Sequence, residues 1–117
     1  MATRGRSARI KGHKFELDMV CWFKDLGWEE CVTSRSESKR LDDKGVDLCY
    51  TKPFNVQLKA VENMGSAHNV LASMPKDSNY NLVFHKKNRK GVVVSMTLGD
   101  FKELIEMLTA NKIIKTQ

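Results

Sequence analysis

The 117-residue sequence has only two prolines and seven glycines, and no apolar run approaches the ~20 residues that a membrane-spanning helix needs. These absences exclude a collagen-like chain and an integral membrane protein. The basic N-terminus lacks the apolar stretch of a secretory signal, so we expect an intracellular, cytoplasmic protein. With 41% hydrophobic and 29% charged residues, the composition predicts a single folded domain over residues 1–117.

Cysteine and histidine do not occur in metal-binding or redox patterns. Cys21, Cys31 and Cys49 are three in number, so at least one cannot form an internal disulfide, and none lies in a C-x-x-C spacing. The three histidines are scattered. Zinc fingers, redox motifs and disulfide frameworks therefore lack support, and we expect each cysteine to be a small buried hydrophobe.

Positive charge is in excess and unevenly distributed. Twenty Lys and Arg residues against fourteen Asp and Glu residues give a net charge of +6. Residues 1–14 hold five cations and no acid, and residues 86–90 hold four more. Such clusters attract polyanions, of which nucleic acid is the commonest, although a solubilising surface is the alternative. The candidate nucleic-acid contacts in these segments are Arg4, Arg6, Arg9, Lys11, Lys86, Lys87, Arg89 and Lys90.

The spacing of apolar residues predicts a small mixed α/β domain. Residues 1–12 are expected to be a basic, mobile arm, and residues 13–26 a helix that stops at Gly27. The last helix is predicted over 98–110, with Thr97 and Asp100 at the spacing of a capping box. Between them we expect a loop over 34–45, a helix over 66–74, and strands over 29–33, 46–50, 55–61, 80–85 and 92–96. The predicted order is α-β-β-β-α-β-β-α.

Two acidic residues interrupt apolar patterns. Glu16 borders the apolar stripe of the first predicted helix, where a solvated boundary residue is the commoner role. Asp47 lies within the strand predicted over 46–50, where an unpaired carboxylate is costly and needs a cation or hydrogen-bond donors nearby. An acid that starts the strand and caps the preceding loop is the alternative.

Gln57 and Lys59 project from one face of the strand predicted over 55–61, because side chains two residues apart share a face. We expect a hairpin between this strand and the one over 46–50. A three-residue loop would place Asp47 opposite Lys59 and beside Gln57, whereas a four-residue loop would turn Asp47 to the other face. An edge strand with a polar outer face is the alternative.

Together these residues have the chemistry of a metal-dependent phosphodiester site. Asp47, Glu16 and the amide oxygen of Gln57 are hard oxygen ligands of the kind that Mg²⁺ prefers. Lys59 beside such a metal could orient an attacking water and stabilise charge on phosphorus. Because Gln57 is neutral, the set holds only two carboxylates, so Glu16 becomes more important for binding a divalent ion.

The stretch over 43–48 (DKGVDL) followed by 56–60 (VQLKA) resembles the PD-(D/E)xK nuclease superfamily, in which a strand Asp precedes a second strand bearing (D/E/Q)-x-K. The Gln form looks like the Mrr-type branch. The layout is also similar to archaeal-type Holliday-junction resolvases, through residues 12–16 (GHKFE), 27–32 (GWEECV), 34–36 (SRS), Asp47 and 57–59 (QLK). It departs from the resolvases at Gln57, where they carry Glu.

The resemblance implies a restriction-endonuclease-like fold with a central mixed five-stranded sheet flanked by helices. It also implies a Mg²⁺ site, which could take Mn²⁺ instead. The site would be formed by Glu16, Asp47, Gln57 and the main-chain carbonyl of Leu58, with Lys59 as the catalytic lysine. Arg35 and Ser36 match the resolvase Arg-Ser segment and would contact the scissile phosphate; an ordinary polar loop is the alternative.

The function expected from this resemblance is a Mg²⁺-dependent, structure-specific DNA endonuclease of the Holliday-junction-resolvase type, which leaves a 5′-phosphate. Resolving a four-way junction takes two symmetric nicks, so we expect a homodimer. A compact stand-alone resolvase suits a phage or mobile element. The alternatives are an Mrr-like or repair nuclease acting on duplex or modified DNA, and a non-catalytic nucleic-acid-binding domain in which Asp47 and Lys59 form a structural pair.

Overall fold

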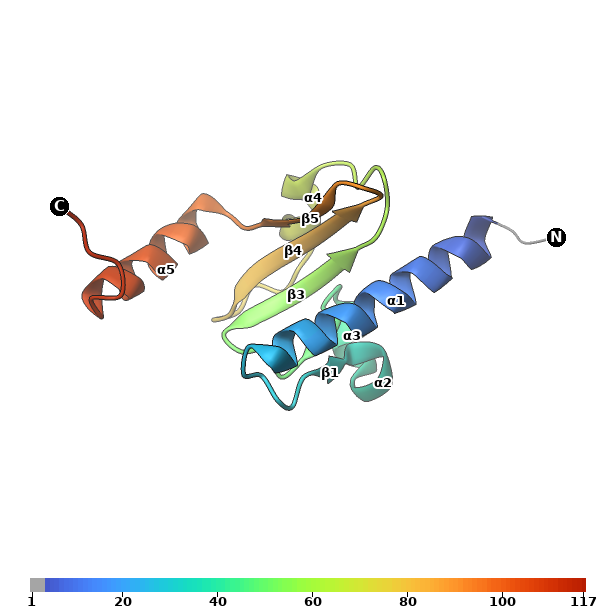
Figure 1. Ribbon diagram of the computed structural model, residues 1–117, viewed down its shortest axis with the longest axis horizontal. Helices are drawn as coiled ribbons and strands as arrows, with labels where there is room; N and C mark the ends of the chain where they lie inside the picture. Colours follow the sequence, from blue (N-terminus) through green and yellow to red (C-terminus); the bar gives the residue numbers. More distant parts are fainter. Residues whose placement is uncertain (1–3) are drawn as a thin grey trace.

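The computed structural model describes residues 4–117, which form five helices and five strands (Figure 1). In chain order the elements are α1 (Arg4–Asp25), β1 (Val32–Thr33), α2 (Ser34–Glu37), α3 (Lys39–Asp43), β2 (Leu48–Cys49), β3 (Phe54–Lys59), α4 (Ala67–Ala72), β4 (Tyr80–Lys87), β5 (Gly91–Ser95) and α5 (Leu98–Ala110). The predicted α/β class and the order of its elements are confirmed, with α2 and α3 added. No helix within the described part of the chain is both long and apolar enough to cross a membrane.

The strands form two small sheets, so the expectation of one five-stranded sheet is wrong. β1 pairs with β2 in an antiparallel sheet, and a second sheet has the order β3-β4-β5, with β3 parallel and β5 antiparallel to β4. β2 pairs with β1 and not with β3 as the predicted hairpin requires. Tyr50 follows β2 with a φ of 62°, which turns the chain out of its extended path before β3 begins.

Helix α1 begins at Arg4 and so corrects the prediction of a mobile arm over 1–12; residues 1–3 of that arm lie outside the described residues. Residues 4–12 are mostly good helix formers and contain no proline, so the helix predicted from His13 extends toward the N-terminus. They carry no apolar stripe, which is why periodicity did not indicate a helix there. In Figure 1, α1 runs beside β3, roughly along the direction of the strands, and its first turns extend past the sheet.

The predicted loop over 34–45 contains two short helices, α2 and α3. Both are almost wholly polar, so the sequence offered no periodic signal. The Ser38 hydroxyl accepts a hydrogen bond from the Leu41 N–H and caps α3. The later helices match their predicted caps, because Ser66 accepts from the Asn69 N–H and Thr97 from the Asp100 N–H.

The core lies between α1 and one face of the three-stranded sheet. Its buried side chains include Phe15, Phe23 and Val56, and Phe23 makes aromatic contacts with Trp28 and Phe84. The buried cysteines Cys31 and Cys49 belong to this interior, where burial raises the pKa of both thiols. Cys21, on the outer side of α1, is exposed, which corrects the expectation that every cysteine is buried.

Candidate active site

Asp47 links the two sheets through its main chain and its side chain. Its N–H donates to the carbonyl of Val56 at 2.7 Å, and its carbonyl accepts from the Ser34 N–H at 2.8 Å. Its carboxylate Oδ2 accepts from the Leu58 N–H at 2.7 Å. Asp47 precedes β2 and is not a strand residue, so neither predicted loop length decides its face. The Leu58 contact fixes its carboxylate at the outer edge of β3.

The carboxyl group of Asp47 has a pKa raised from 3.8 to about 6. Burial is the largest cause, and the charges of Glu16 and Asp42 add to it. The Leu58 N–H and the charge of Lys59 act in the opposite direction. Asp47 therefore lies within electrostatic range of both Glu16 and Lys59, and its ionised form is held at a cost that a bound cation would reduce.

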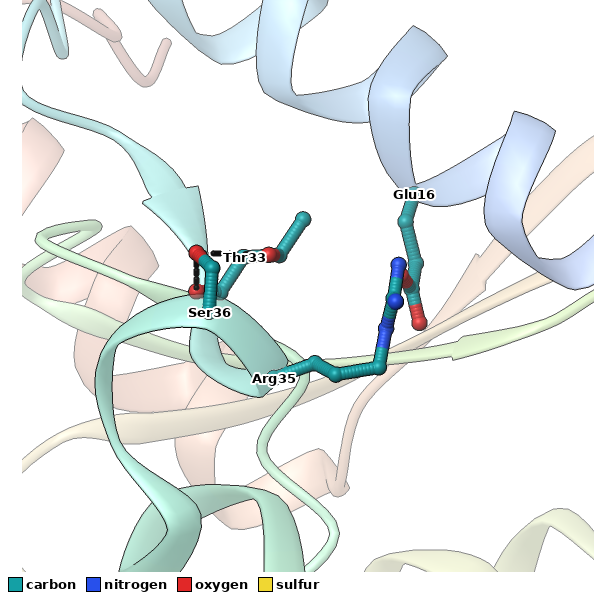
Figure 2. Close-up of polar contacts among 4 residues, drawn as sticks. All are labelled: Glu16, Thr33, Arg35 and Ser36. Atoms are coloured by element: carbon teal, nitrogen blue, oxygen red, sulfur yellow. Dashed lines mark hydrogen bonds and ion pairs between the residues drawn. The ribbon is translucent and has the colours of Figure 1, made fainter.

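Glu16 reaches the site from α1. Its neighbour Phe15 is buried in the core, and the Glu16 side chain itself is only 17% exposed. Figure 2 shows Arg35 extending from α2 to this carboxylate; the Glu16 Oε2 accepts from Arg35 Nη2 at 2.9 Å and from Nε at 3.3 Å. Glu16 is thus both an ion-paired boundary residue and a neighbour of Asp47, which combines the two alternatives considered for it.

Arg35 and Ser36 have partners within the protein. Arg35 pairs with Glu16, and the Ser36 hydroxyl donates to the Thr33 carbonyl at 2.9 Å and accepts from the Thr33 hydroxyl at 3.0 Å (Figure 2). Ser36 therefore fixes the start of α2. Its predicted contact with a phosphate stays a prediction, as does that of Arg35, whose guanidinium remains about half exposed.

Gln57 presents a buried oxygen to the site. Its Oε1 accepts no hydrogen bond from any described residue, and the only other such buried side-chain atom among residues 4–117 is Ser34 Oγ. An unsatisfied buried acceptor costs roughly 1–3 kcal/mol, so it calls for an explanation such as a ligand. The Gln57 amide packs against Gly45, where an added Cβ would lie 3.3 Å from both Oε1 and Nε2.

Lys59 and the carbonyl of Leu58 complete the predicted set. Lys59 is half-buried at the end of β3, and it shares a strand face with Gln57. The N–H and C=O of one strand residue point to the same edge, so the Leu58 carbonyl points toward the side where its N–H meets Asp47. The Asp47 carboxylate and the Leu58 main chain thus lie at the outer edge of β3, the Gln57 amide packs beside Gly45, and Glu16 and Lys59 lie within electrostatic range of Asp47.

Three contributors were not predicted: the Leu58 N–H, Ser34 and Gly45. Leu58 was expected to act through its carbonyl alone, and nothing in the sequence indicates that its N–H binds Asp47. Gly45 could have been noticed in the sequence, because it lies two residues before Asp47. In the structure its φ is 77°, a backbone conformation in which residues other than glycine are strained.

The donor set is compatible with a hard divalent cation. Two carboxylates, the buried Gln57 oxygen and one main-chain carbonyl are ligands that Mg²⁺ accepts, with waters filling its other positions. Within residues 4–117, no group of three or more His, Cys, Asp and Glu side chains is placed to hold a metal ion. A metal at this edge would consequently depend on the oxygens of Gln57 and Leu58.

One of the two basic segments contacts α1. Lys86, at the end of β4, places its Nζ 5.8 Å from the ring centre of Phe15 on α1. Arg6, Arg9 and Lys11 are exposed on the first turns of α1, and the end of β4 and the turn after it expose further cations, Lys87, Arg89 and Lys90. Arg4 begins α1, but its side chain lies outside the described residues.

Comparison with known proteins gave no match to a family model, to a curated protein or to a solved structure. The resemblance to the nuclease superfamily therefore stays a prediction from the sequence motifs.

Proposed function

We propose that the protein is a Mg²⁺-dependent DNA endonuclease specific for DNA structure, with four-way junctions as its substrate. The restriction-endonuclease-like resemblance and the Holliday-junction-resolvase layout remain part of this proposal. The observation that carries it is the buried Gln57 Oε1, which accepts no hydrogen bond from the described residues and belongs to an amide that packs against Gly45, two residues before Asp47. Structural roles for Asp47 and Lys59 leave that oxygen without an explanation.

Glu16, Asp47, Gln57 and the Leu58 carbonyl would hold the metal. Mg²⁺ bound there supplies an activated water and neutralises charge on the phosphate. The Leu58 N–H orients the Asp47 carboxylate, and Arg35 orients Glu16. Lys59 stabilises negative charge that develops on the phosphate and positions the attacking water. The products are a 5′-phosphate and a 3′-hydroxyl.

The cations of α1 and of the β4–β5 turn would bind the flanking duplex. Contacts between such side chains and phosphates position DNA without reading its sequence. Lys86, whose Nζ lies 5.8 Å from the centre of the Phe15 ring, places a cation of the segment over 86–90 beside the α1 helix that carries Glu16. This arrangement favours recognition of DNA shape, because phosphate contacts carry no sequence information.

A cleavage assay with end-labelled DNA tests the proposal. A four-way junction, a flap, a linear duplex and a single strand would be incubated with Mg²⁺ or Mn²⁺. We expect paired symmetric nicks in the junction, lost in Asp47→Asn and in Lys59→Ala. Asp42→Asn is a matched control, because Asp42 also influences the pKa of Asp47 but is not among the proposed ligands. Cleavage by both Asp variants alike would contradict the assignment of Asp47.

The choice of substrate separates two nuclease functions. Metal-dependent cutting of linear or modified duplex, with the junction not preferred, would retain the catalytic site and move the function to an Mrr-like or repair nuclease. Mutating Asp47 should abolish either activity.

A non-catalytic nucleic-acid-binding domain is the second candidate. The bond of 2.9 Å between Arg35 and Glu16 favours it, because an ion-paired Glu16 has a structural role without any metal. No cleavage of any substrate, together with salt-sensitive DNA binding that is equal in wild type and Asp47→Asn, would establish this candidate.

A further inference from the structure

The outer edge of β5 is uncovered and apolar. In the three-stranded sheet β5 pairs only with β4, so half of its main-chain groups point out of the sheet. The strand contains three consecutive valines and no charge, and all three are exposed, Val93 at 63%. Natural proteins protect free edges with charges, prolines or bulges. An edge without such protection indicates a strand partner.

Helix α5 continues this apolar surface. None of its thirteen residues, all of them described, is buried, although the helix is amphipathic. Leu98, Phe101 and Met107 are exposed large apolar side chains. In Figure 1, α5 extends away from the sheet, beyond the end of β5. A helix with an apolar face gains stability mainly by packing that face, so α5 also lacks a partner within its own chain.

The exposed area is large for a chain of this size. A folded monomer of 13.4 kDa is expected to expose about 6500 Å², whereas this structure exposes 8488 Å². The excess of about 2000 Å² is more than the ~800 Å² per partner that a standard interface buries. Among residues 4–117, most of the exposed large apolar side chains lie between Val92 and Ile114.

Charge shows which kind of partner fits. α5 carries three acids and one lysine, a net charge of −2, in a chain of net charge +6. This sign disfavours DNA on α5. The β4–β5 turn has the opposite sign, with four cations over residues 86–90. The chain therefore has an acidic segment directly after β5 and a basic segment directly before it.

We propose that the occupant of this surface is a second copy of the chain, paired through β5. Two β5 strands side by side in antiparallel fashion would form one six-stranded sheet about a twofold axis near Val93, the central residue of the strand. Antiparallel pairing places the end of one β5 beside the start of the other. The acidic α5 of each copy then passes the basic turn of its partner, which gives complementary charges at both ends of the interface.

This inference names the partner that the proposed function requires, since paired nicks need two active sites. Its observations concern β5 and α5, however, and oligomeric state is measured without DNA. A dimer without nuclease activity would retain the interface and reject the function. A monomer that cleaves DNA would retain the proposed nuclease function and reject the interface.

Light scattering coupled to size exclusion tests the interface. We expect wild type at twice 13.4 kDa and Val93→Lys at 13.4 kDa, with an unchanged far-ultraviolet circular dichroism spectrum. The variant places two lysines opposite each other across the axis. Leu17→Lys, at an equally exposed apolar residue of α1, is the matched control and should remain dimeric. A monomeric wild type at the highest soluble concentration, or a dimeric Val93→Lys, would overturn the proposal.

Oxidative cross-linking tests the pairing itself. In a Cys21→Ser background, which removes the exposed thiol, Val93→Cys should form a disulfide-linked dimer, because opposed strand residues have Cα atoms about 4.5–5.5 Å apart. Leu17→Cys in the same background should not. Equal cross-linking of the two variants would contradict strand pairing at Val93.

Discussion

The two edges of the three-stranded sheet are built in opposite ways. At the β3 edge, Asp47 covers the outward main-chain groups, because its N–H binds the Val56 carbonyl and its carboxylate binds the Leu58 N–H. At the β5 edge, three exposed valines follow one another with no strand beyond them. The β3 edge is thus closed within the chain by a charged side chain, whereas the β5 edge is left for another chain.

The comparison shows where the molecule gives up stability. A main-chain carbonyl could accept from the Leu58 N–H without burying a charge. The chain uses the Asp47 carboxylate instead, and burial raises the pKa of this group to about 6. An unfavourable group at an otherwise well-packed place is typical of functional sites. At β5 the cost is solvent-exposed apolar surface, which association would remove.

The largest expected effect is on cleavage. Replacing Asp47 by Asn removes one of only two carboxylates proposed to hold the metal, so the rate of junction cleavage should fall by about 10³-fold or more. Single-turnover rates in Mg²⁺ measure this loss. A Val93→Thr variant, altered at the opposite edge, should keep the rate per dimer; if it lost as much activity as Asp47→Asn, the two edges would not have separate roles.

Replacing a buried valine and an exposed valine of the same sheet should have different effects on stability. Val83 is fully buried in β4, so Val83→Ala should lower the free energy of unfolding by about 2–3 kcal/mol, because the substitution leaves a cavity. Val93→Ala should cost less than about 0.5 kcal/mol in the folded monomer. Urea denaturation at low protein concentration, where dimers dissociate, measures both. Equal losses would show that β5 is covered within one chain.

Asp47→Asn should stabilise the protein while it abolishes activity. The folded-state pKa of Asp47 is raised above its unfolded value of 3.8, so its contribution favours folding at low pH and is lost as the pH rises through about 6. The variant should therefore gain about 1–3 kcal/mol over wild type above pH 6, and the gain should shrink toward pH 4. Chemical denaturation at several pH values tests this. A variant less stable than wild type at pH 8 would refute the account of Asp47.

Gly45 should be needed for the β3 edge in particular. Gly45→Ala brings a Cβ to 3.3 Å from the Gln57 amide at a φ of 77°, and should cost about 1–2 kcal/mol of unfolding free energy. Gly65→Ala is the control, since its φ is 79° but nothing lies within 4 Å of the added Cβ. The difference between the two variants isolates the Gln57 contact, and equal losses would mean that this contact has no effect.

Metal affinity should depend on the ionisation of Asp47. With a pKa of about 6, the ionised fraction of Asp47 falls about tenfold between pH 7.5 and pH 5. The Mg²⁺ dissociation constant should therefore rise about tenfold, which corresponds to a loss of ~1.4 kcal/mol of binding free energy. Titration calorimetry at both values measures it. An affinity that does not change with pH would exclude Asp47 as a ligand.

Most elements of the fold could be predicted from the sequence, because their local signals agree with the packing. The helix over 98–110 was placed correctly by its apolar spacing and by Thr97 as its cap, and the strands of the larger sheet were predicted close to their observed positions from short apolar stretches bounded by polar turns. The pairing of strands was not predictable in the same way. β2 pairs with β1 through contacts distant in sequence, which neither hairpin length nor alternation encodes.

The candidate site was predicted by residue type, and its geometry was not. Asp47 lies within electrostatic range of Glu16 and Lys59, although the hairpin invoked to join Asp47 to the strand of Gln57 and Lys59 does not form. Asp47 reaches β3 through the Leu58 N–H, a main-chain contact that leaves no mark in the sequence. The pairing of Arg35 with Glu16 likewise depends on α2, a polar helix without a periodic signal.

The most direct test of the metal site is Mn²⁺ binding without DNA, followed by electron paramagnetic resonance of the free ion. We predict one ion per chain for wild type and for the Asp42→Asn control, and strong loss of binding in Asp47→Asn and Gln57→Leu. Binding that is unchanged in both of these variants, or absent in wild type, would contradict a metal site at the β3 edge and leave Asp47 a structural residue.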